Sequence, residues 1–346
     1  MNRAIPKVTV VIPHFNGEDI LRRCLLSLQK TAYADFCVLV VDNGSTDGSR
    51  GMVRKEFLEV RMAESPINLG FAEGCNLGIR NSMSPYVALL NNDTEVTPGW
   101  LGPLVDIADA DASVAAVQPK ILSLHDRRRF DYCGGAGGEI DLFGYPFTWG
   151  RLFDDMEMDE GQYDSQRQVF WATGAAVLLR RSALDRVGLL EERFFAHMEE
   201  IDLDWRLQWA GYKIIIAPEA VVFHRTGSTL GAERLRKMVL NHRNSLLMML
   251  RNQTGQALLW LFPTRLLLEG VTVIASVMMG KPKRALAVFA GLFGVLLRWR
   301  TVVEGRKVVE SIRSVPEEVL LHRMYRGSVA MAYYVKGIRR ARDLKL

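Results

Sequence analysis

Residues 86–96 read YVALLNNDTEV, and this stretch decides the fold. Tyr86–Leu90 is a wholly apolar run of strand length, which is typical of a strand buried on both faces. It ends abruptly in the polar residues Asn91, Asn92 and Asp93. The same pattern occurs twice earlier, in VTVVIPHFN (8–16) and CVLVVDNG (37–44). The sequence therefore predicts several buried strands, each followed by a polar cluster.

Helical segments separate these strands. The apolar residues after the first strand recur at helical spacing (Ile20, Leu21, Cys24, Leu25 and Leu28). Further strands are expected at Val60–Glu64 and Val114–Val117. Strands that alternate with helices predict an α/β fold with a parallel, doubly wound sheet. Ligands bind beyond the carboxyl ends of the strands in such sheets, which is where the polar clusters fall.

The middle of the chain is less regular. Residues 143–167 are rich in glycine and acids and are predicted to form a loop, and ordered structure is expected again over Trp171–Arg180. Phe194–Gly211 is predicted to be helical, with Ile201, Trp205 and Trp209 on one buried face.

Charge is distributed unevenly along the 346 residues. Residues 1–250 carry 27 Lys and Arg against 33 Asp and Glu, whereas residues 251–346 carry 17 against 6. A basic, apolar tail therefore follows a mildly acidic body, which favours an anionic partner for the tail, either membrane headgroups or nucleic acid.

The four cysteines show no metal-ligand spacing. We expect reduced thiols in a cytosolic protein. The first residues enter a strand without a charged start and an apolar stretch, so no secretion signal is expected.

Three strand-end positions carry chemistry. Asp42 can bond a uracil or thymine imide N–H or a ribose hydroxyl, and the alternative is a helix cap or an Asx turn. Asp93 can hold a hard divalent cation, and the alternative is a simple turn. His224 follows the strand-like run Ala220–Phe223 and can be a second ligand for Mg²⁺ or Mn²⁺, although a lone histidine there is more often structural.

Residues 194–206, FFAHMEEIDLDWR, contain four acids within six positions. Glu199 and Asp202 share one helix face, and Asp202 can pair with Arg206 at i+4. A solvated acidic face is the alternative, but aromatic residues would not normally flank it.

Seven segments of the chain resemble family 2 glycosyltransferases of the GT-A fold, and most closely the bacterial rhamnosyltransferase type. They are VVIPHFNGEDILRRCLLSL, VVDNGSTDGS, NLGFAEGCNLGI, LLNNDTEV, TGAAVLLRRSALDRVG, FFAHMEEIDLDWRLQWAGY and VVFHRTGS. They occur in the family's order and spacing and span roughly residues 8–230.

The resemblance implies a role for each matching position. Asp42 would recognise the base, while Pro13, Asn16, Asn68 and Gly70 would line the nucleotide pocket. Asn91, Asn92 and Asp93 stand at the DXD motif, with Asp93 as the metal-binding acid, and His224 matches the family's downstream metal-binding histidine. Glu200 stands at the general base, with Glu199 and Asp202 as the alternatives.

The function that follows is inverting transfer of a sugar from a dTDP- or UDP-sugar to a hydroxyl of a saccharide or lipid-linked saccharide, in cell-surface polysaccharide synthesis. Rhamnose and the dTDP donor are favoured by the resemblance alone. A processive synthase would be expected to carry a QxxRW motif, and a nucleotidyltransferase a basic, glycine-rich loop after the first strand; neither feature is found. A non-enzymatic membrane or nucleic-acid binding protein would leave the strand-end acids unexplained.

The resemblance and the change in composition divide the chain into a catalytic domain, residues 1–235, and a basic, apolar helical region, residues 236–346. Leu258–Gly280 is 23 residues long, which is nominally enough to span a bilayer, but Arg265 and Glu269 lie near its middle. We therefore predict peripheral attachment to the cytoplasmic face of an anionic membrane, with no nucleic-acid partner. The alternative is a soluble helical subdomain that buries the same residues against the catalytic body or a second subunit.

Overall fold

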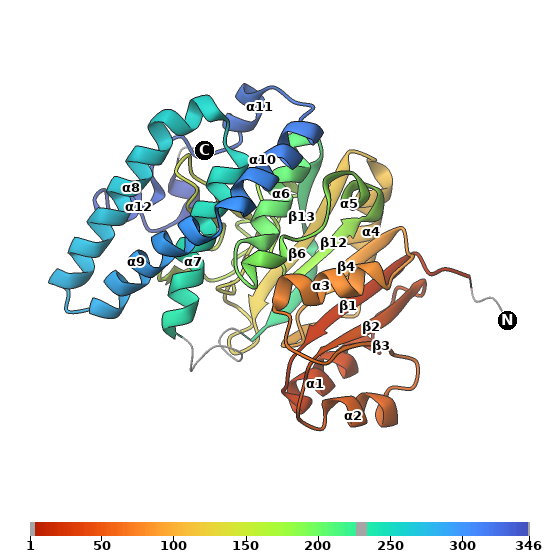
Figure 1. The fold of residues 1–346 in the computed structure, drawn as a ribbon. Helices are drawn as coiled ribbons and strands as arrows, with labels where there is room; N and C mark the ends of the chain where they lie inside the picture. The colour runs from red at the N-terminus through yellow and green to blue at the C-terminus, as the bar shows by residue number, and fades with distance from the viewer. Residues whose placement is uncertain (1–3, 226–233, 345–346) are drawn as a thin grey trace.

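The protein is described over residues 4–225 and 234–344 in a computed structural model (Figure 1). The last residues of the quoted segment VVFHRTGS, Thr226, Gly227 and Ser228, lie outside this part of the chain.

A mixed sheet forms the centre of the molecule, in the order β11-β13-β6-β12-β4-β1-β2-β3, with β5 paired to β13. The strands of its parallel half are β1 (Val8–His14), β2 (Phe36–Asn43), β3 (Arg61–Ser65) and β4 (Tyr86–Leu90). The others are β5 (Thr94–Val96), β6 (Val114–Ser123), β11 (Arg167–Gln168), β12 (Ala176–Arg180) and β13 (Lys213–His224). The predicted α/β class is confirmed, while β6 runs six residues beyond the predicted Val114–Val117 because it pairs with the long strand β13.

Helices cover both faces of this sheet (Figure 1). The helices α1 (Glu18–Leu28), α2 (Ser49–Glu56) and α4 (Gly102–Ala110) pack on one face, and α3 (Phe71–Arg80), α5 (Arg181–Val187) and α6 (Glu199–Trp209) pack on the other. Strand β1 shows why: Val10 and Ile12 belong to the first core cluster and Val11 to the second, because successive side chains of a strand point to opposite faces.

The predicted loop 143–167 is wrong in part. Short strands within it join β7 (Gly138–Ile140) in a second, antiparallel sheet: β8 (Pro146–Thr148), β9 (Arg151–Leu152) and β10 (Asp155–Met156). Strands of two or three residues are too short to show an alternating pattern in sequence.

The helix predicted over Phe194–Gly211 begins only at Glu199. Phe195, His197 and Met198 have φ of 68°, 70° and 74°, which an α-helix does not allow. The expected apolar face is present, because Ile201, Trp205 and Trp209 are all buried in one core cluster.

The C-terminal part of the chain is helical, and part of it packs against α6 (Figure 1). Its helices are α7 (Arg234–Asn252), α8 (Gly255–Met278), α9 (Pro282–Leu297), α10 (Trp299–Ile312), α11 (Glu317–Leu321) and α12 (Val329–Tyr334). Trp205 and Trp209 of α6 share a core cluster with Leu246 and Leu250 of α7. The division at residue 235, which stays a prediction, would therefore cut through a continuous hydrophobic core.

Candidate active site

The site begins at the carboxyl end of the parallel strands. The register of β1 and β2 pairs Pro13 with Val41 and His14 with Asp42, so the two polar clusters that follow lie side by side. Strand β4 adjoins β1 and delivers Asn91 and Asp93 to the same edge. This confirms that the strand-end clusters converge, as the sequence pattern predicts.

Asp42 is buried, and only one of its two carboxylate oxygens accepts hydrogen bonds from the described residues. Its Oδ2 accepts hydrogen bonds from Nε of Arg50 at 2.6 Å and from the backbone N–H of Ser45 at 3.3 Å. Its Oδ1 is buried and, among the described residues, has no hydrogen-bond partner. A buried carboxylate oxygen without a donor is costly, and an imide N–H or a hydroxyl of a bound nucleotide would satisfy it.

The loop at residues 68–70 is fastened to β2. Asn43 donates from Nδ2 to Oδ1 of Asn68 at 3.2 Å and to the carbonyl of Gly70 at 2.9 Å. The Asn68 oxygen also accepts the N–H of Gly70 at 2.9 Å. Asn16 is likewise bound to backbone, since its Oδ1 accepts from the N–H of Thr46 at 2.9 Å. Asn16 and Asn68 therefore shape the two loops beside Asp42.

Asn92, His14 and Ser49 are connected by hydrogen bonds at this edge. Nδ2 of Asn92 lies 2.8 Å from Nδ1 of His14, and Nε2 of His14 lies 2.8 Å from the hydroxyl of Ser49. Burial lowers the pKa of His14, so the ring is neutral at pH 7. These hydrogen bonds hold Asn92 in place and connect the end of β4 to β1 and α2.

Asp93 and His224 meet although they lie far apart in sequence. Strand β13 pairs with β5 so that His224 is opposite Thr94, next to Asp93. Nε2 of His224 lies 3.2 Å from Oδ1 of Asp93, and its Nδ1 lies 2.8 Å from Oδ1 of Asp131. Burial alone would lower the pKa of His224, but the hydrogen bonds to Asp131 and Asp93 outweigh it and raise this pKa well above the ordinary value.

This arrangement fits a divalent cation. Both Asp93 and His224 are buried, and the imidazole of His224 lies between the carboxylates of Asp93 and Asp131. Carboxylate oxygen and imidazole nitrogen are ligands that Mn²⁺ and Mg²⁺ accept. Asp131 bonds the other ring nitrogen, which is the second partner that a metal-ligating histidine normally has.

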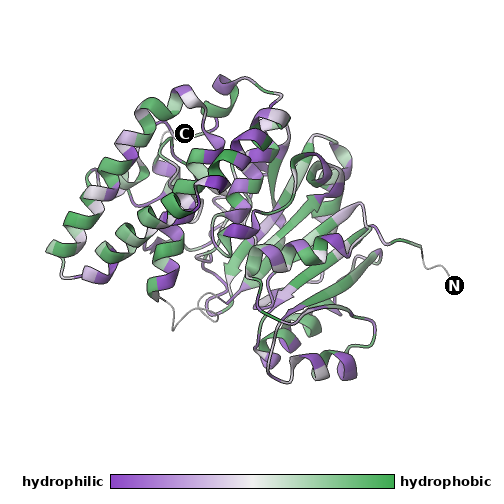
Figure 2. Cartoon of the chain, viewed as in Figure 1, coloured by the Kyte–Doolittle hydropathy of each residue, from purple (hydrophilic) through white to green (hydrophobic). Residues whose placement is uncertain are grey.

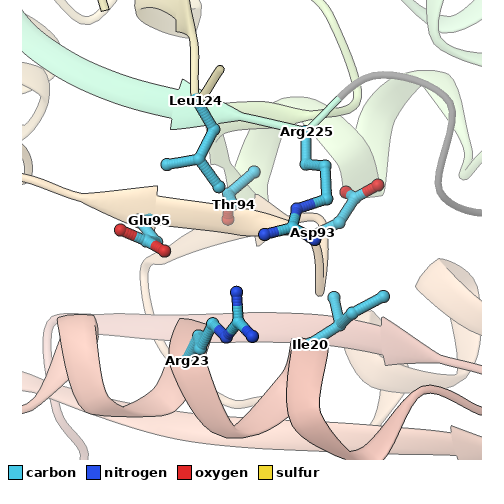
Figure 3. A pocket seen from close by; sticks show the side chains of 7 residues that line it. All are labelled: Ile20, Arg23, Asp93, Thr94, Glu95, Leu124 and Arg225. Carbon is cyan, nitrogen blue, oxygen red and sulfur yellow. The ribbon is translucent and has the colours of Figure 1, made fainter.

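A small hollow, open to solvent, lies next to Asp93. Figure 3 shows the guanidinium groups of Arg23, from α1, and Arg225, after β13, pointing into it from opposite sides. The backbone N–H of Arg225 also donates to the carbonyl of Asp93 at 3.0 Å. Two arginine side chains therefore lie beside this acid.

Glu199 and Glu200 begin helix α6, and Glu200 lies beside Gly174. A Cβ placed on Gly174 would lie 3.9 Å from Cβ of Glu200, and the next residue, Ala175, accepts the N–H of Asn91 at 2.9 Å. Burial raises the pKa of Glu200 to about 7, and burial together with the charge of Glu200 raises the pKa of Glu199 well above its usual value.

The model for "Glycosyl transferase family 2" matches residues 9–188, slightly more than half of the chain. The chain belongs to this family. The resemblance stated from the seven segments is thereby confirmed.

Curated relatives of this glycosyltransferase include the N-acetylglucosaminyl-diphospho-decaprenol L-rhamnosyltransferase of Mycobacterium tuberculosis. It is 28% identical over 294 residues, which cover 81% of this chain and 94% of that protein. The O-antigen biosynthesis protein RfbC of Myxococcus xanthus is 27% identical over 67% of this chain but only 18% of its own length.

Solved structures show the same fold. The mannosyltransferase PcManGT of Pyrobaculum calidifontis, in complex with GDP-Man and Mn²⁺, has a TM-score of 0.51 and 18% identity, covering 89% of this chain and 86% of that one. S. aureus TarS 1–349 has a TM-score of 0.53 and 15% identity, covering 92% and 93%. GalNAc-T7 with UDP, GalNAc and Mn²⁺ has a TM-score of 0.55 and 14% identity, covering 71% and 48%. The predicted GT-A fold is confirmed by these likenesses.

The glycosyltransferase holds Asp202 differently from the two glutamates. The predicted pair with Arg206 forms at 3.1 Å, and Arg251 and Asn252 of α7 bind the other oxygen at 2.9 and 2.8 Å. Burial would raise the pKa of Asp202, but the charges of Arg251 and Arg206 hold it below the ordinary value. Both oxygens of the Asp202 carboxylate therefore accept hydrogen bonds within the protein. In contrast, Oε2 of Glu200 has no hydrogen-bond partner among the described residues.

Asp131 and Asn43 are among the residues of the site that are not predicted from the sequence. Asp131 lies in the loop after β6 and follows no apolar run, so nothing marks it before the fold is known. Asn43 lies directly after Asp42 at a strand end, and this position was its only signal.

Proposed function

We propose that this glycosyltransferase moves a sugar, rhamnose in the first instance, from a dTDP- or UDP-sugar to a hydroxyl of a lipid-linked saccharide, with inversion at the anomeric carbon. The observation that carries the proposal is the position of Glu200, whose pKa is near 7. Glu200 lies beside Gly174, and the next residue, Ala175, is hydrogen-bonded to Asn91 at the edge of the sheet. A base, a nucleotide pocket and a cation site thus share one edge of the sheet.

The chain's own residues divide the work. Asp42 accepts the imide N–H of the base through its free Oδ1, and Asn16, Asn43 and Asn68 hold the surrounding loops. Asp93 and His224 would hold the divalent cation, and Asp131 keeps the imidazole in place. When bound, the cation neutralises charge on the diphosphate leaving group.

Glu200 removes the proton from the acceptor hydroxyl as the oxygen attacks the anomeric carbon. The C–O bond to the diphosphate breaks as the new glycosidic bond forms, and a single displacement inverts the configuration. A base with a pKa near 7 is well matched to this task at neutral pH.

The choice of sugar and acceptor rests on the relatives. The M. tuberculosis relative is named for rhamnosyl transfer to a diphospho-decaprenol-linked sugar, and RfbC is named for O-antigen biosynthesis. The experiment is a donor screen with purified protein, with and without Mn²⁺ or Mg²⁺. Asp93→Ala should lower the rate at least ~100-fold. Full activity in EDTA would refute the cation-dependent mechanism.

We also propose that the C-terminal helices attach the enzyme to the cytoplasmic face of an anionic membrane. Among the described residues, α8 is the one unbroken helix long and apolar enough to cross a bilayer, and α9 with α10 would be a second only if a pair bent by 65° were one span. Arg265 and Glu269 pair at 2.9 Å, buried against Tyr145 and Ser245, so they point toward the protein.

Figure 2 shows that α8 and α9 consist largely of hydrophobic residues, and many of their apolar side chains are exposed. Leu259, Met278 and Phe293 are 79%, 83% and 61% exposed. Lys281, Lys283 and Arg284 are exposed where α8 passes to α9. Apolar side chains bordered by cations suit a surface of anionic lipid, with the helices lying in the interface.

Vesicle flotation tests this attachment. The protein should float with anionic liposomes at low salt and less at high salt. Phe289→Ser with Phe293→Ser should weaken flotation, whereas Leu58→Ser with Met83→Ser, which removes two exposed apolar side chains elsewhere, should not. If the intact protein fails to float and elutes as a dimer that the Phe289/Phe293 variant breaks, the face is a subunit interface instead.

A further inference from the structure

The segment before the two glutamates has an unusual backbone. Phe195, His197 and Met198 all have positive φ, and none of them is glycine. Such a conformation is unfavourable for residues other than glycine, and it persists only where neighbouring structure imposes it. Residues 194–198, which we call the base loop, lead directly into Glu199 and Glu200 at the start of α6.

One side of the base loop rests on helix α3. The carbonyl of Phe195 accepts the N–H of Phe71 at 2.7 Å and that of Ala72 at 3.2 Å. These are donors at the first turn of α3, which have no partner within the helix. Gly70 permits this approach, because a Cβ there would lie 2.6 Å from the Phe195 carbonyl oxygen.

The other side of the base loop is held by one amide from the C-terminal region. Nδ2 of Asn244, on α7, donates to the carbonyls of Phe194 at 3.0 Å, Ala196 at 2.9 Å and His197 at 2.8 Å. Asn244 is completely buried. Its two N–H groups thus serve three carbonyls of a segment that makes few regular hydrogen bonds of its own.

Arg243 fixes the direction in which this amide points. Nε of Arg243 donates to Oδ1 of Asn244 at 2.8 Å, and its Nη2 donates to the Phe194 carbonyl at 3.0 Å. Turning the amide over would place its oxygen against three carbonyl oxygens and its NH₂ against a guanidinium. The favourable orientation of the Asn244 amide is therefore the one in which its NH₂ group donates to the base loop.

We propose that Asn244 is a positioning residue: it holds the base loop in the conformation that presents the Glu199–Glu200 pair to the acceptor hydroxyl. The proposal rests on the proposed function for its chemistry, but its structural part can be measured without turnover. It gives the C-terminal helices a second task besides membrane attachment, since α7 completes the catalytic machinery from outside the family 2 match over residues 9–188.

The test compares Asn244→Asp, Asn244→Ala and Ser245→Ala. Asn244→Asp keeps the shape and the bond to Arg243 but leaves no donors for the loop. Ser245 is the neighbouring buried residue, and its hydroxyl binds Arg265 and the His242 carbonyl rather than the loop. Ser245→Ala therefore controls for the loss of a buried polar contact on the same helix.

Both Asn244 variants should speed hydrogen–deuterium exchange over residues 194–200 and lower kcat by about 10–100-fold, because small misplacements of a reacting group are costly. The donor KM should stay within about threefold, since the loop does not hold the nucleotide. Ser245→Ala should change neither exchange nor kcat. Asn244→Gln, which keeps the donors on a longer side chain, should recover part of the rate.

Unchanged exchange in Asn244→Asp, or an equal loss of kcat in Ser245→Ala, would overturn the proposal. Faster exchange with normal kcat would also overturn it. The activity of Glu200→Gln then shows whether the proposed function fails as well or only the role of Asn244. An inactive Glu200→Gln would leave the proposed function intact, whereas an active one would remove both.

Discussion

Nδ1 of His224 lies 2.8 Å from Oδ1 of Asp131, on the side of the ring opposite Asp93. The carboxylate fixes the rotation of the imidazole and keeps a proton on Nδ1, which leaves Nε2 as the nitrogen for a cation. A carboxylate that bonds the other ring nitrogen of a metal-ligating histidine commonly contributes about 10–100-fold to metal affinity.

Asp131→Asn should therefore raise the Mn²⁺ concentration for half-maximal activity by about 10–100-fold, with little change in rate at saturating Mn²⁺. The measurement is a Mn²⁺ titration of initial rate, supported by electron paramagnetic resonance of bound ion. Asp126→Asn, a nearby half-exposed acid paired with Arg129 at 3.6 Å, is the matched control. An unaltered titration for Asp131→Asn would show that His224 is oriented by something else.

Substitution of the acids of α6 separates the three candidates for the base. Glu200→Gln retains shape and removes proton acceptance, so turnover should fall by roughly 10²–10⁴ while donor binding is retained. Asp202→Asn should instead affect stability, since Asp202 is bound by Arg206, Arg251 and Asn252. Single-turnover rates, with donor affinity measured separately by calorimetry, distinguish these effects. Normal turnover of Glu200→Gln beside an inactive Glu199→Gln would move the assignment by one residue.

The rate should depend on pH through Glu200. Burial raises the pKa of this group to about 7, and only its deprotonated form can accept the hydroxyl proton. The value of kcat/KM should therefore rise about tenfold per pH unit below that pKa and level off above it. A profile from pH 5 to 9 at saturating cation measures this. The residual activity of Glu200→Gln should lack the inflection; if it keeps one near pH 7, another group carries the proton.

The sequence locates the edge of the sheet but not the contacts made across it. Asp42 and Asp93 follow apolar strands, and parallel strands end at one edge, so their convergence is predictable. Asp131 lies in a loop, and its contact with His224 depends on the pairing of β13 with both β5 and β6. No local pattern encodes such a long-range register.

The same limit explains the base loop and the acids after it. Hydrophobic spacing identifies the buried face of α6, whereas the positive φ of Phe195, His197 and Met198 is imposed by α3 and α7. The i+4 pair of Asp202 and Arg206 is predictable from one helix. Arg251, which reaches the same carboxylate from a different helix, is not.

Arg251 links α7 to the catalytic part of the chain and should contribute strongly to stability. It is buried, its Nε lies 2.9 Å from Asp202 and its Nη1 lies 2.6 Å from Glu191 and 3.0 Å from the Thr301 carbonyl. Arg251→Met leaves both carboxylates with one cation fewer in a buried site, which costs about 3–5 kcal/mol of unfolding free energy. Urea unfolding followed by tryptophan fluorescence measures it.

Arg313→Met is the control for that experiment. Arg313 is an exposed arginine that lies over the Trp209 ring, 4.5 Å from its centroid. Its substitution should lower the free energy of unfolding by less than about 1 kcal/mol. Adding Asp202→Asn to Arg251→Met should recover part of the loss, since it removes one of the carboxylates left without its cation. One cooperative transition in every variant would mean that α6 and α7 unfold together, as their shared core implies. Two separate transitions, with Arg251→Met shifting only the second, would instead show that the C-terminal helices fold apart from the catalytic sheet.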